Sequence, residues 1–371
     1  MSTGTQFKDI FNREAILDLS RRAVAAAPGV DSRRFVREAT HGLESLEMKD
    51  RVRLLARTLR AHLAPDYPRA LEQLEVLAGS EQGPLTPLRG FRIWPLCHFV
   101  EDYGLDHLDA SMRMMRLLTT RFTSEFAIRP FLLRYPEQTL AYLHDWTKDP
   151  DETVRRLVSE GTRPRLPWAQ RLPAFQKDPT PVLALLEKLK ADPALFVRRS
   201  VANNLNDIAK DHPERVVDVV RRWSRESPAP ETQWLIRHAS RTLVKQGNPG
   251  VLEVLGFTRK PRLELQAFKL ASKAVQLGGA LQLHVELRSK ARSDQKLVID
   301  YRIHHRKASG ELSPKVFKWT TRQLAAGERL ALQRVHKIQP ITTRRYYPGQ
   351  HRVELLVNGQ ALGSHEFTLS V

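Results

Sequence analysis

Apolar residues recur at helical spacing through roughly the first 255 residues of the chain. The pattern is clearest at Val52–Leu63, Met112–Leu118 and Val182–Leu189. Apolar side chains three or four positions apart line one face of a helix, so this pattern predicts amphipathic helices. Prolines separate the segments into lengths of about 12–20 residues, which are usual for globular helices. These prolines are Pro65, Pro68, Pro84, Pro87, Pro136, Pro150, Pro179, Pro193, Pro213 and Pro228.

A weak repeat is visible in the second part of this helical region. Asp151–Leu157 and Asp192–Ser200 share an acidic start and a Val-Arg-Arg core, with Val154 and Val197 lying 43 positions apart. A third copy, Trp234–Arg241, follows at a similar spacing. Periods near 40 residues with two helices per unit are typical of HEAT-like arrays. Chance similarity between amphipathic helices is the alternative, and the shared arginine position favours the array.

Beyond about residue 256 the pattern changes to alternation of apolar and polar residues. Leu281–Leu287 alternates strictly, and Val353–Val357 begins in the same way. Asn358-Gly359 is a strong signal for a tight hairpin turn. Further strands are predicted at Lys296–His304, Val316–Trp319, Arg329–Val335 and Phe367–Val371. Seven or so short strands in about 115 residues favour an immunoglobulin-like sandwich.

The chain is therefore predicted to be mainly α, with two domains of different class. Residues 1–256 are expected to form a HEAT-like α-solenoid, and residues 257–371 an all-β immunoglobulin-like sandwich. Cys97 is the single cysteine, which excludes a disulfide within the chain and a cysteine-based zinc site.

The charge is strongly positive and unevenly placed. Sixty Lys and Arg against 41 Asp and Glu give a formal charge of +19, divided as +1 over residues 1–150, +6 over 151–250 and +12 over 251–371. Such an excess favours a polyanionic partner, with nucleic acid first and an anionic membrane surface second. A well-solvated basic surface is the alternative. Hydrophobic residues at 41% exclude wholesale disorder.

Several kinds of site are absent from the sequence. It contains no phosphate-binding GxxxxGK[ST] loop, no HExxH and no GxSxG. The adjacent His304 and His305 would face opposite sides of a strand, so we expect no metal site and no cofactor. No run of eighteen apolar residues or signal-like start is present, and we expect a cytoplasmic protein without a membrane partner.

Four segments of the helical region carry a family resemblance. They resemble the AlkC family of bacterial DNA alkylation repair glycosylases, relatives of AlkD that are built on HEAT-like repeats. The resemblance spans most of residues 1–255, and some AlkC proteins are similar in carrying a C-terminal immunoglobulin-like domain. The segments are Thr123–Leu132, Arg155–Trp168, Val197–Lys210 and Ile236–Lys245, with Leu43–Arg51 nearer the start.

The resemblance implies a base excision repair enzyme. Such an enzyme hydrolyses the N-glycosidic bond of cationic methylated bases in duplex DNA, especially 3-methyladenine and 3-methylcytosine, without flipping the base into a pocket. It would act as a monomer in the cytoplasm, associated with the nucleoid when bound to DNA. No lysine is singled out as a Schiff-base nucleophile, so we expect a monofunctional glycosylase.

The residues that match the family motif are Glu125, Glu160 and Asp207, with Trp168 as the aromatic residue. A cationic methylated base is already a good leaving group, so the site must mainly stabilise a positive, oxocarbenium-like sugar. Carboxylates supply that stabilisation, and one of them can orient or deprotonate the attacking water. An indole face beside the cationic nucleotide adds about 0.5–2 kcal/mol of attraction.

Each of these residues also has an ordinary structural interpretation. Glu160 has the spacing of an ion-pair partner for Arg156 or Arg163, and Asp207 that of a partner for Lys210. Without the resemblance, these two acids would be assigned to such pairs.

Glu125 could likewise favour the dipole at a helix start. Trp168, between a proline and an amphipathic run, would ordinarily be a core residue.

Acids close to DNA require surrounding cations, and arginines are plentiful in the motif segments. We expect the helical ones to hold phosphates and to position the duplex without reading sequence. They are Arg155, Arg156, Arg163, Arg165, Arg198, Arg199, Arg237 and Arg241. In the sandwich, Arg344 and Arg345 lie in a basic, aromatic segment, 342–349, that could grip the DNA backbone; a basic surface that only improves non-specific attraction is the alternative.

A function of another class fits the same composition. A HEAT-like scaffold that binds DNA or RNA without catalysis would share the fold and the charge. Retention of Glu160, Trp168 and Asp207 argues for the enzyme.

Overall fold

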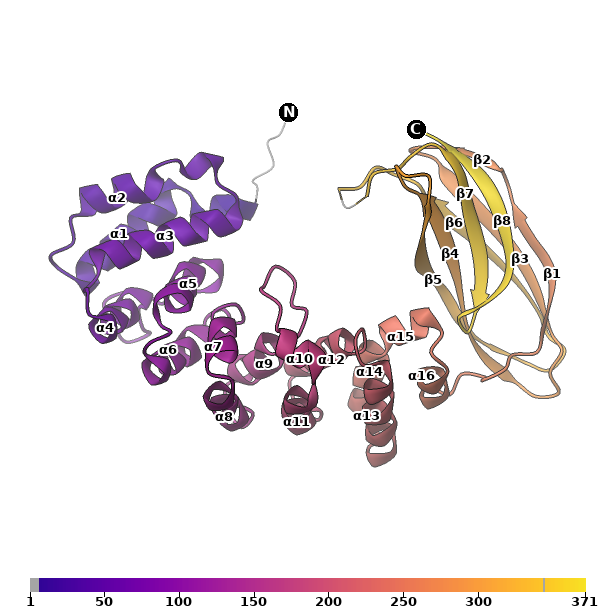
Figure 1. The fold of residues 1–371 in the computed structure, drawn as a ribbon, viewed down its shortest axis with the longest axis horizontal. Coiled ribbons are helices and arrows are strands. Elements are labelled where there is room, and N and C mark those ends of the chain that lie inside the picture. Colours follow the sequence, from indigo (N-terminus) through magenta and orange to yellow (C-terminus); the bar gives the residue numbers. More distant parts are fainter. Residues whose placement is uncertain (1–6, 343) are drawn as a thin grey trace. The chain divides into compact units, whose positions relative to one another are not determined.

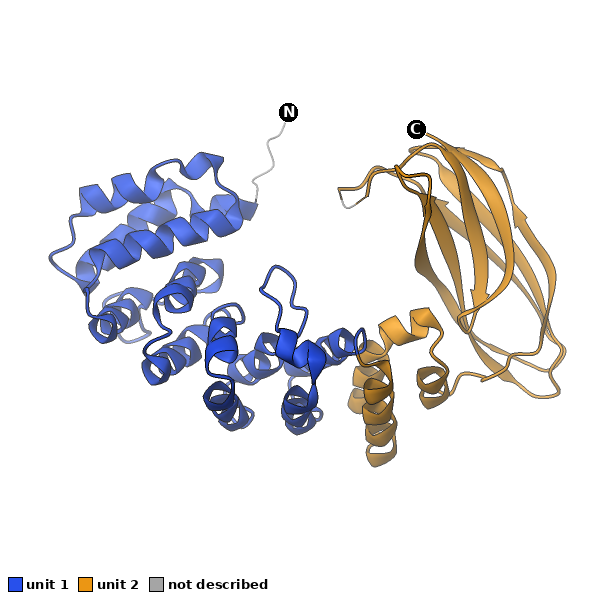
Figure 2. Ribbon diagram, in the orientation of Figure 1, with its two compact units in different colours: residues 1–211 blue, residues 212–371 orange. Residues whose placement is uncertain are grey.

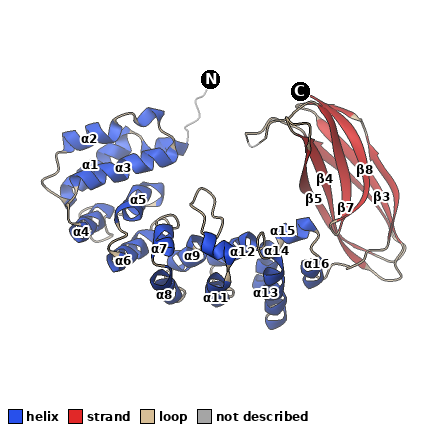
Figure 3. Ribbon diagram, viewed as in Figure 1, coloured by secondary structure: helices blue, strands red, loops and turns tan. Residues whose placement is uncertain are grey.

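The computed structural model describes residues 7–342 and 344–371. Contacts divide the chain into two compact units, Met1–Asp211 and His212–Val371 (Figure 2). Helices occupy the described chain up to Val254, and strands begin at Leu263 (Figure 3). The secondary structure therefore changes inside the second unit. Thr343, in the basic segment singled out by the sequence, lies outside the described residues.

The first unit consists of helices. In Figure 1, α9 and α12 lie side by side, as do α8 and α11, and the two pairs contact each other. The helices are α1 (Arg13–Ala26), α2 (Ser32–Thr40), α3 (Met48–His62), α4 (Tyr67–Ala78), α5 (Trp94–Tyr103), α6 (Leu108–Thr119), α7 (Ile128–Arg134), α8 (Pro136–Trp146), α9 (Glu152–Gly161), α10 (Pro173–Lys177), α11 (Thr180–Leu189) and α12 (Leu195–Ile208), with short 3₁₀ turns at Phe7–Phe11, Leu43–Ser45 and Gly90–Ile93.

Local sequence explains where several of these helices begin. Asp66 and Asp151 precede α4 and α9, and their carboxylates accept hydrogen bonds from first-turn amides. Pro136 opens α8, because the first turn of a helix does not need the missing N–H. The three apolar segments predicted as helices lie in α3, α6 and α11, except that Leu63 follows the last residue of α3, so those predictions are confirmed.

The second unit contains four helices and eight strands among its described residues. The helices are α13 (Pro213–Glu226), α14 (Pro230–Ala239), α15 (Arg241–Gln246) and α16 (Pro249–Val254). The strands are β1 (Leu263–Leu270), β2 (Ala274–Gln276), β3 (Ala280–Ser289), β4 (Gln295–Arg306), β5 (Leu312–Leu324), β6 (Arg329–Lys337), β7 (Gly349–Val357) and β8 (Gln360–Ser370).

The strands form two sheets, one of order β1-β3-β6 and one of order β2-β8-β7-β4-β5. All neighbours are antiparallel except β2 and β8, which run parallel. Alternating residues of β3, such as Leu283 and Val285, pack with Tyr301 of β4 and Leu355 of β7 in one hydrophobic core. The six predicted strands are present, although Val371 lies beyond β8, and β1 and β2 were not predicted.

The predicted turn at Asn358-Gly359 is confirmed. Both residues have positive φ, 47° and 79°, as a two-residue hairpin between β7 and β8 requires. The Asn358 side chain also accepts a hydrogen bond from the Val298 amide at 2.8 Å and donates one to the Thr258 carbonyl at 2.7 Å. The turn thereby ties β4 to the segment that precedes the sandwich.

Candidate active site

Helices α9 and α12 meet along a buried polar seam. The Ser159 hydroxyl of α9 donates to the Ser200 hydroxyl of α12 at 2.7 Å, and Asn204 donates to the Ser159 carbonyl at 2.8 Å. At the end of α9, a Cβ added to Gly161 would lie 2.7 Å from the Ile128 side chain, so α7 packs there against bare backbone. This packing fixes the positions of the motif acids on α9 and α12.

Glu160 and Asp207 share one guanidinium. Arg163 donates from Nη1 to Glu160 Oε1 at 2.6 Å and from Nε to Asp207 Oδ2 at 2.8 Å. The second oxygen of Glu160 accepts the Ser200 hydroxyl at 2.6 Å, and that of Asp207 accepts the Lys210 ammonium at 2.9 Å. The ion pairs that the ordinary interpretation assigned to both acids are therefore present, and the same contacts bring the acids together.

This cluster is almost completely buried. Glu160 is 5% exposed, Asp207 2% and Arg163 9%. Burial by itself lowers the pKa of Arg163, but Glu160 and Asp207 outweigh that effect and the pKa is raised. The guanidinium therefore stays charged between the two carboxylates. Because an unpaired buried charge is costly, removing Arg163 would leave the acids uncompensated.

Glu125 joins the same cluster through a second arginine. Arg156 donates from Nη1 to Glu125 Oε2 at 2.5 Å and to Thr123 Oγ1 at 3.1 Å, and its Nη2 lies 3.6 Å from Glu160 Oε1. The guanidinium also lies 5.0 Å from the centre of the half-exposed Phe196 ring. We call the alternating chain of Glu125, Arg156, Glu160, Arg163, Asp207 and Lys210 the charge ladder.

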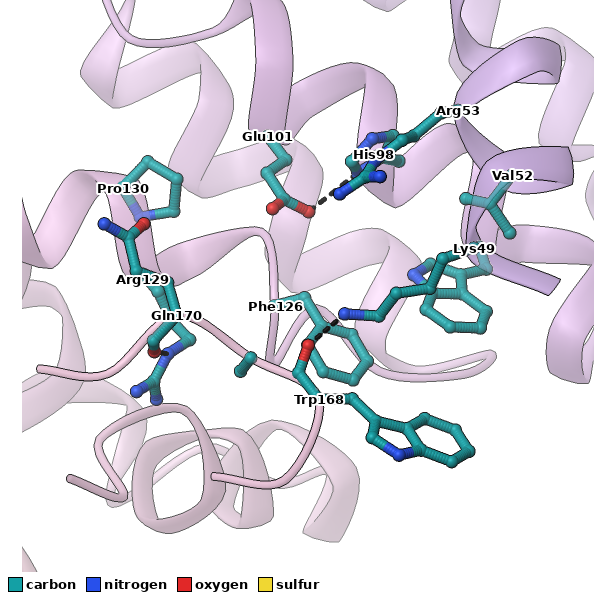
Figure 4. A pocket seen from close by; sticks show the side chains of 12 residues that line it. Lys49, Val52, Arg53, His98, Glu101, Phe126, Arg129, Pro130, Trp168 and Gln170 are labelled. Atoms are coloured by element: carbon teal, nitrogen blue, oxygen red, sulfur yellow. Dashed lines mark hydrogen bonds and ion pairs between the residues drawn. The ribbon is translucent and has the colours of Figure 1, made fainter. Parts of the chain in front are cut away.

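Trp168 lies in the segment that connects α9 to α10, and its side chain is 71% exposed. The alternative that it is a core residue is therefore wrong. Its φ of 64° falls in the left-handed region, which costs a non-glycine residue about 1–2 kcal/mol. Lys49 donates a hydrogen bond to its carbonyl oxygen, while the indole extends away from that contact (Figure 4). An exposed aromatic side chain on a strained backbone is a frequent feature of functional sites.

A cavity of about 250 Å³ adjoins Trp168. Its wall combines aromatic and charged side chains, among them Trp94, Phe126 and Glu101. Glu101 Oε2 bonds to Nδ1 of His98 at 2.8 Å (Figure 4). The sequence did not indicate this cavity, because its residues come from α3, α5, α7, the segment before α7 that holds Phe126, and the segment after α9.

Comparisons with known proteins agree with these observations. Residues 120–243 match the model of the family described as DNA alkylation repair enzyme, and residues 264–371 match that of the C-terminal Ig-like domain of the uncharacterised protein YhaZ. The chain is 38% identical to uncharacterized protein YhaZ of Bacillus subtilis over 363 residues, covering 97% of this chain and 98% of that one. It is 40% identical to Pseudomonas fluorescens alkylpurine DNA glycosylase AlkC, solved bound to DNA containing an abasic site analogue, with a TM-score of 0.91 over 99% of this chain and 100% of that one.

The chain belongs to the AlkC family of DNA alkylation repair glycosylases. The family resemblance and the class of enzyme predicted from the sequence are thereby confirmed. The immunoglobulin-like character of the C-terminal strands is confirmed as well.

Two of the arginines expected at DNA make contacts that hold this AlkC-family fold together. Arg155 makes a bidentate ion pair with the buried Asp192, at 2.6 and 3.0 Å. Arg198 donates from Nη1 to the carbonyls of Asp192 and Pro193, both at 2.7 Å. Because these contacts direct both side chains to the loops between helices, we expect Arg155 and Arg198 to serve the fold more than the phosphate backbone.

The other helical arginines divide by their surroundings. Arg156 and Arg163 neutralise the acids of the charge ladder. Arg165 pairs with Asp211 in bidentate fashion, at 2.9 and 2.6 Å. Arg199 and Arg237 are exposed, and Arg241 is half-buried and donates to the His238 carbonyl at 2.7 Å.

In the AlkC-family sandwich, one arginine of the basic segment contacts a buried residue and the other is exposed. Arg344 donates to Nε2 of the buried His305 and lies 6.0 Å from the Tyr346 ring. Arg345 is exposed, 5.5 Å from the Tyr347 ring. Arg345 is therefore the one with its guanidinium directed to an open surface.

Among the residues that the structure describes, no three His, Cys, Asp or Glu side chains are grouped as metal ligands would be. None of the described helices has both the length and the apolar character that crossing a bilayer requires.

Proposed function

We propose that this protein is a monofunctional glycosylase that removes 3-methyladenine and 3-methylcytosine from duplex DNA. The observation that carries the proposal is the pairing of Glu160 and Asp207 around Arg163, with the exposed Trp168 in the segment after α9 that also contains Arg163. The membership of the AlkC family and the DNA bound to the Pseudomonas fluorescens relative support the substrate class. The protein would act as a monomer on nucleoid DNA in the cytoplasm.

In the proposed reaction, the positive charge of the lesion makes the base a good leaving group, and the carboxylates stabilise the sugar. The C1′–N bond of the cationic nucleotide breaks, and the base leaves as a neutral molecule with the bonding electron pair. Asp207 and Glu160 stabilise the positive sugar that remains. Water then adds to C1′, and its proton passes to a carboxylate. Because the cationic base is a good leaving group without protonation, it does not need a pocket with a general acid. The base can therefore stay stacked while the bond breaks.

In the proposed mechanism, DNA draws Lys210 away from Asp207. Asp207 Oδ1 is covered by the ammonium of Lys210, whose side chain is 43% exposed on a flexible stem. A phosphate near this surface competes with Asp207 for that ammonium. When Lys210 moves to the phosphate, one oxygen of Asp207 faces the sugar, while Arg163 keeps the other in place.

The cationic surface suits a duplex read by its backbone. On the helical side, the exposed Arg199 and Arg237 would contact phosphates as parts of a HEAT-like solenoid over residues 1–256. On the sandwich, residues 257–371, Arg345 would add a second contact. Trp168 would lie against the lesion nucleotide, where its indole face attracts the cationic base.

A scaffold without catalysis is the second candidate, and a specific observation favours it. Every oxygen of Glu160 and Asp207 already has a partner in the protein, as expected of structural acids. Duplex DNA treated with a methylating agent distinguishes the two functions. Release of free methylated base, measured by chromatography, supports the enzyme; normal DNA binding with no released base supports the scaffold.

A further inference from the structure

Two cations from distant parts of the first unit hold the segment that carries Trp168. This segment, residues 162–172, connects α9 to α10 and contains no helix or strand of its own. It nevertheless presents a 71% exposed indole from a backbone in the left-handed region at Trp168. A conformation of this kind persists only where the surroundings enforce it.

Arg129 of α7 supplies the first constraint. Its side chain is only 1% exposed, and it gives three hydrogen bonds to main-chain carbonyls around the segment. Nη1 donates to the carbonyls of Gly161 and Arg163, both at 2.9 Å, and Nε donates to that of Gln170 at 2.6 Å. The two ends of the segment are therefore held by one rigid guanidinium fork. Lysine, with a single point of attachment, could not replace it.

Lys49 of α3 supplies the second constraint, from 119 positions away in the chain. Its ammonium donates to the carbonyl of Trp168 itself and lies 5.1 Å from the centre of the Phe126 ring (Figure 4). Phe126 follows the ladder residue Glu125 directly. Lys49 thus connects the tip of the segment to the chain that carries one of the motif acids.

We propose that Lys49 and Arg129 are positioning residues, which hold the 162–172 segment so that the Trp168 indole meets the lesion nucleotide in the geometry needed for excision. This inference rests on the proposed function. Neither side chain needs to touch the DNA. Misplacement of a group in an active site by about 1 Å costs up to 10²-fold in rate. Loss of the contacts that hold Trp168 should therefore lower the excision rate measurably.

Lys49→Met tests the proposal best, because Lys49 is only half-buried and methionine keeps its stem over Phe126. Lys8→Met is the matched control, because it makes the same chemical change at a lysine that pairs with Glu47 at 2.8 Å and is not part of the cavity wall. Single-turnover excision should fall about tenfold in Lys49→Met and less than about twofold in Lys8→Met.

A double-mutant cycle with Trp168→Ala separates positioning from direct DNA contact. If Lys49 acts through Trp168, adding Lys49→Met to Trp168→Ala changes the rate less than about twofold. A full tenfold loss in that background, or a loss of affinity with a smaller salt dependence, would mean that Lys49 binds phosphate itself and would overturn the proposal. An unchanged rate in Lys49→Met would overturn it as well.

Hydrogen exchange gives a readout that needs no activity. Amides of the 162–172 segment should exchange faster in Lys49→Met than in wild type, and as in wild type in Lys8→Met. Exchange that is unchanged in Lys49→Met contradicts the positioning role. If the wild-type protein releases no base while Lys49→Met loosens the segment, the proposed glycosylase function fails but the mechanical constraint stands.

Discussion

Arg155 and Arg198, 43 positions apart, make the same two hydrogen bonds in the two Val-Arg-Arg copies of the sequence repeat. Each donates from Nη1 to the main-chain carbonyls five and six positions before it: Arg155 at 3.0 and 2.8 Å, Arg198 at 2.7 and 2.7 Å. The arginine that both repeats share therefore clamps the loop that leads into its own helix. This contact explains why an arginine occurs at this position of both copies. The next arginine in each copy, Arg156 or Arg199, does not make it.

Arg198→Met should lower the free energy of unfolding by about 1–2 kcal/mol, because two carbonyl partners lose a charged donor. Urea unfolding measures this effect. The folded fraction should bind DNA with an unchanged salt dependence. Arg199→Met, one position along, should change stability by less than about 0.5 kcal/mol and reduce the slope of log affinity against log salt by about 1. A smaller salt slope in Arg198→Met, or a loss of stability in Arg199→Met, would contradict these two roles.

The Val-Arg-Arg pattern alone does not predict which of its two arginines binds the preceding loop. Successive helical residues point about 100° apart, so one arginine of the pair faces the preceding loop and the other faces elsewhere. Which is which depends on how the helix is rotated against its neighbours. In α9 the second arginine, Arg156, enters the charge ladder, whereas in α12 the second, Arg199, is exposed.

Gly161→Ala should destabilise the protein by about 1–3 kcal/mol, because the new methyl group would lie 2.7 Å from Ile128. Denaturant unfolding checks this. Combining it with Ile128→Ala, which removes the opposing atoms, should give a smaller loss than the sum of the two single changes. Gly29→Ala, with no atom within 4 Å, is the control and should stay within about 0.5 kcal/mol of wild type. If the losses of unfolding free energy in the two single variants add up to that of the double variant, Gly161 and Ile128 are not in tight contact.

The sandwich should lose stability as the pH falls below about 6.5. Burial, reinforced by Arg344, lowers the pKa of His305 to about 3, and burial with Arg334 lowers that of His336 to about 4. In the unfolded chain both histidines take up protons near pH 6.5, whereas the folded sandwich excludes them until pH 3–4. Unfolding is therefore favoured progressively through that window.

Denaturant titrations followed by hydrogen exchange in β4 measure this loss between pH 7 and pH 5. His305→Gln should have a shallower dependence of the denaturant midpoint on pH than wild type. Equal dependence in the two proteins would contradict the role of His305.

Arg345→Ala should weaken DNA binding almost equally for all sequences and reduce the salt slope by about 1, because one phosphate contact is lost. Arg345→Lys keeps the charge and should keep the slope. Affinity measured by fluorescence anisotropy at several salt concentrations tests both. If Arg345→Ala has the wild-type slope, the exposed part of the basic segment does not meet the backbone.

Much of the fold follows from local patterns. Helical periodicity gave α3, α6 and α11, and the Asn358-Gly359 pair gave the hairpin. The three-residue β2 is too short for alternation to appear, and the register of β1 is interrupted by a bulge between Leu265 and Ala267, which breaks the period-two pattern.

The geometry of the site lies beyond such patterns. Glu160 follows Val154 by six positions and Asp207 follows Val197 by ten, so the repeat does not align the two acids. Arg163, located just after α9, brings them together. Likewise, the side chains that hydrogen-bond to the segment around Trp168 are Lys49 and Arg129, which are far from it in sequence.

Single-turnover release of 3-methyladenine and 3-methylcytosine by the Asp207→Asn variant tests the central claim most directly. Asp211→Asn is the matched control, because Asp211 follows the same helix and holds Arg165 without joining the charge ladder. We predict that Asp207→Asn loses about 10²–10³-fold in excision rate, as when a transition-state charge contact is removed. It should bind DNA as tightly as wild type or more tightly, while Asp211→Asn excises normally. Excision at the wild-type rate by folded Asp207→Asn would contradict the account.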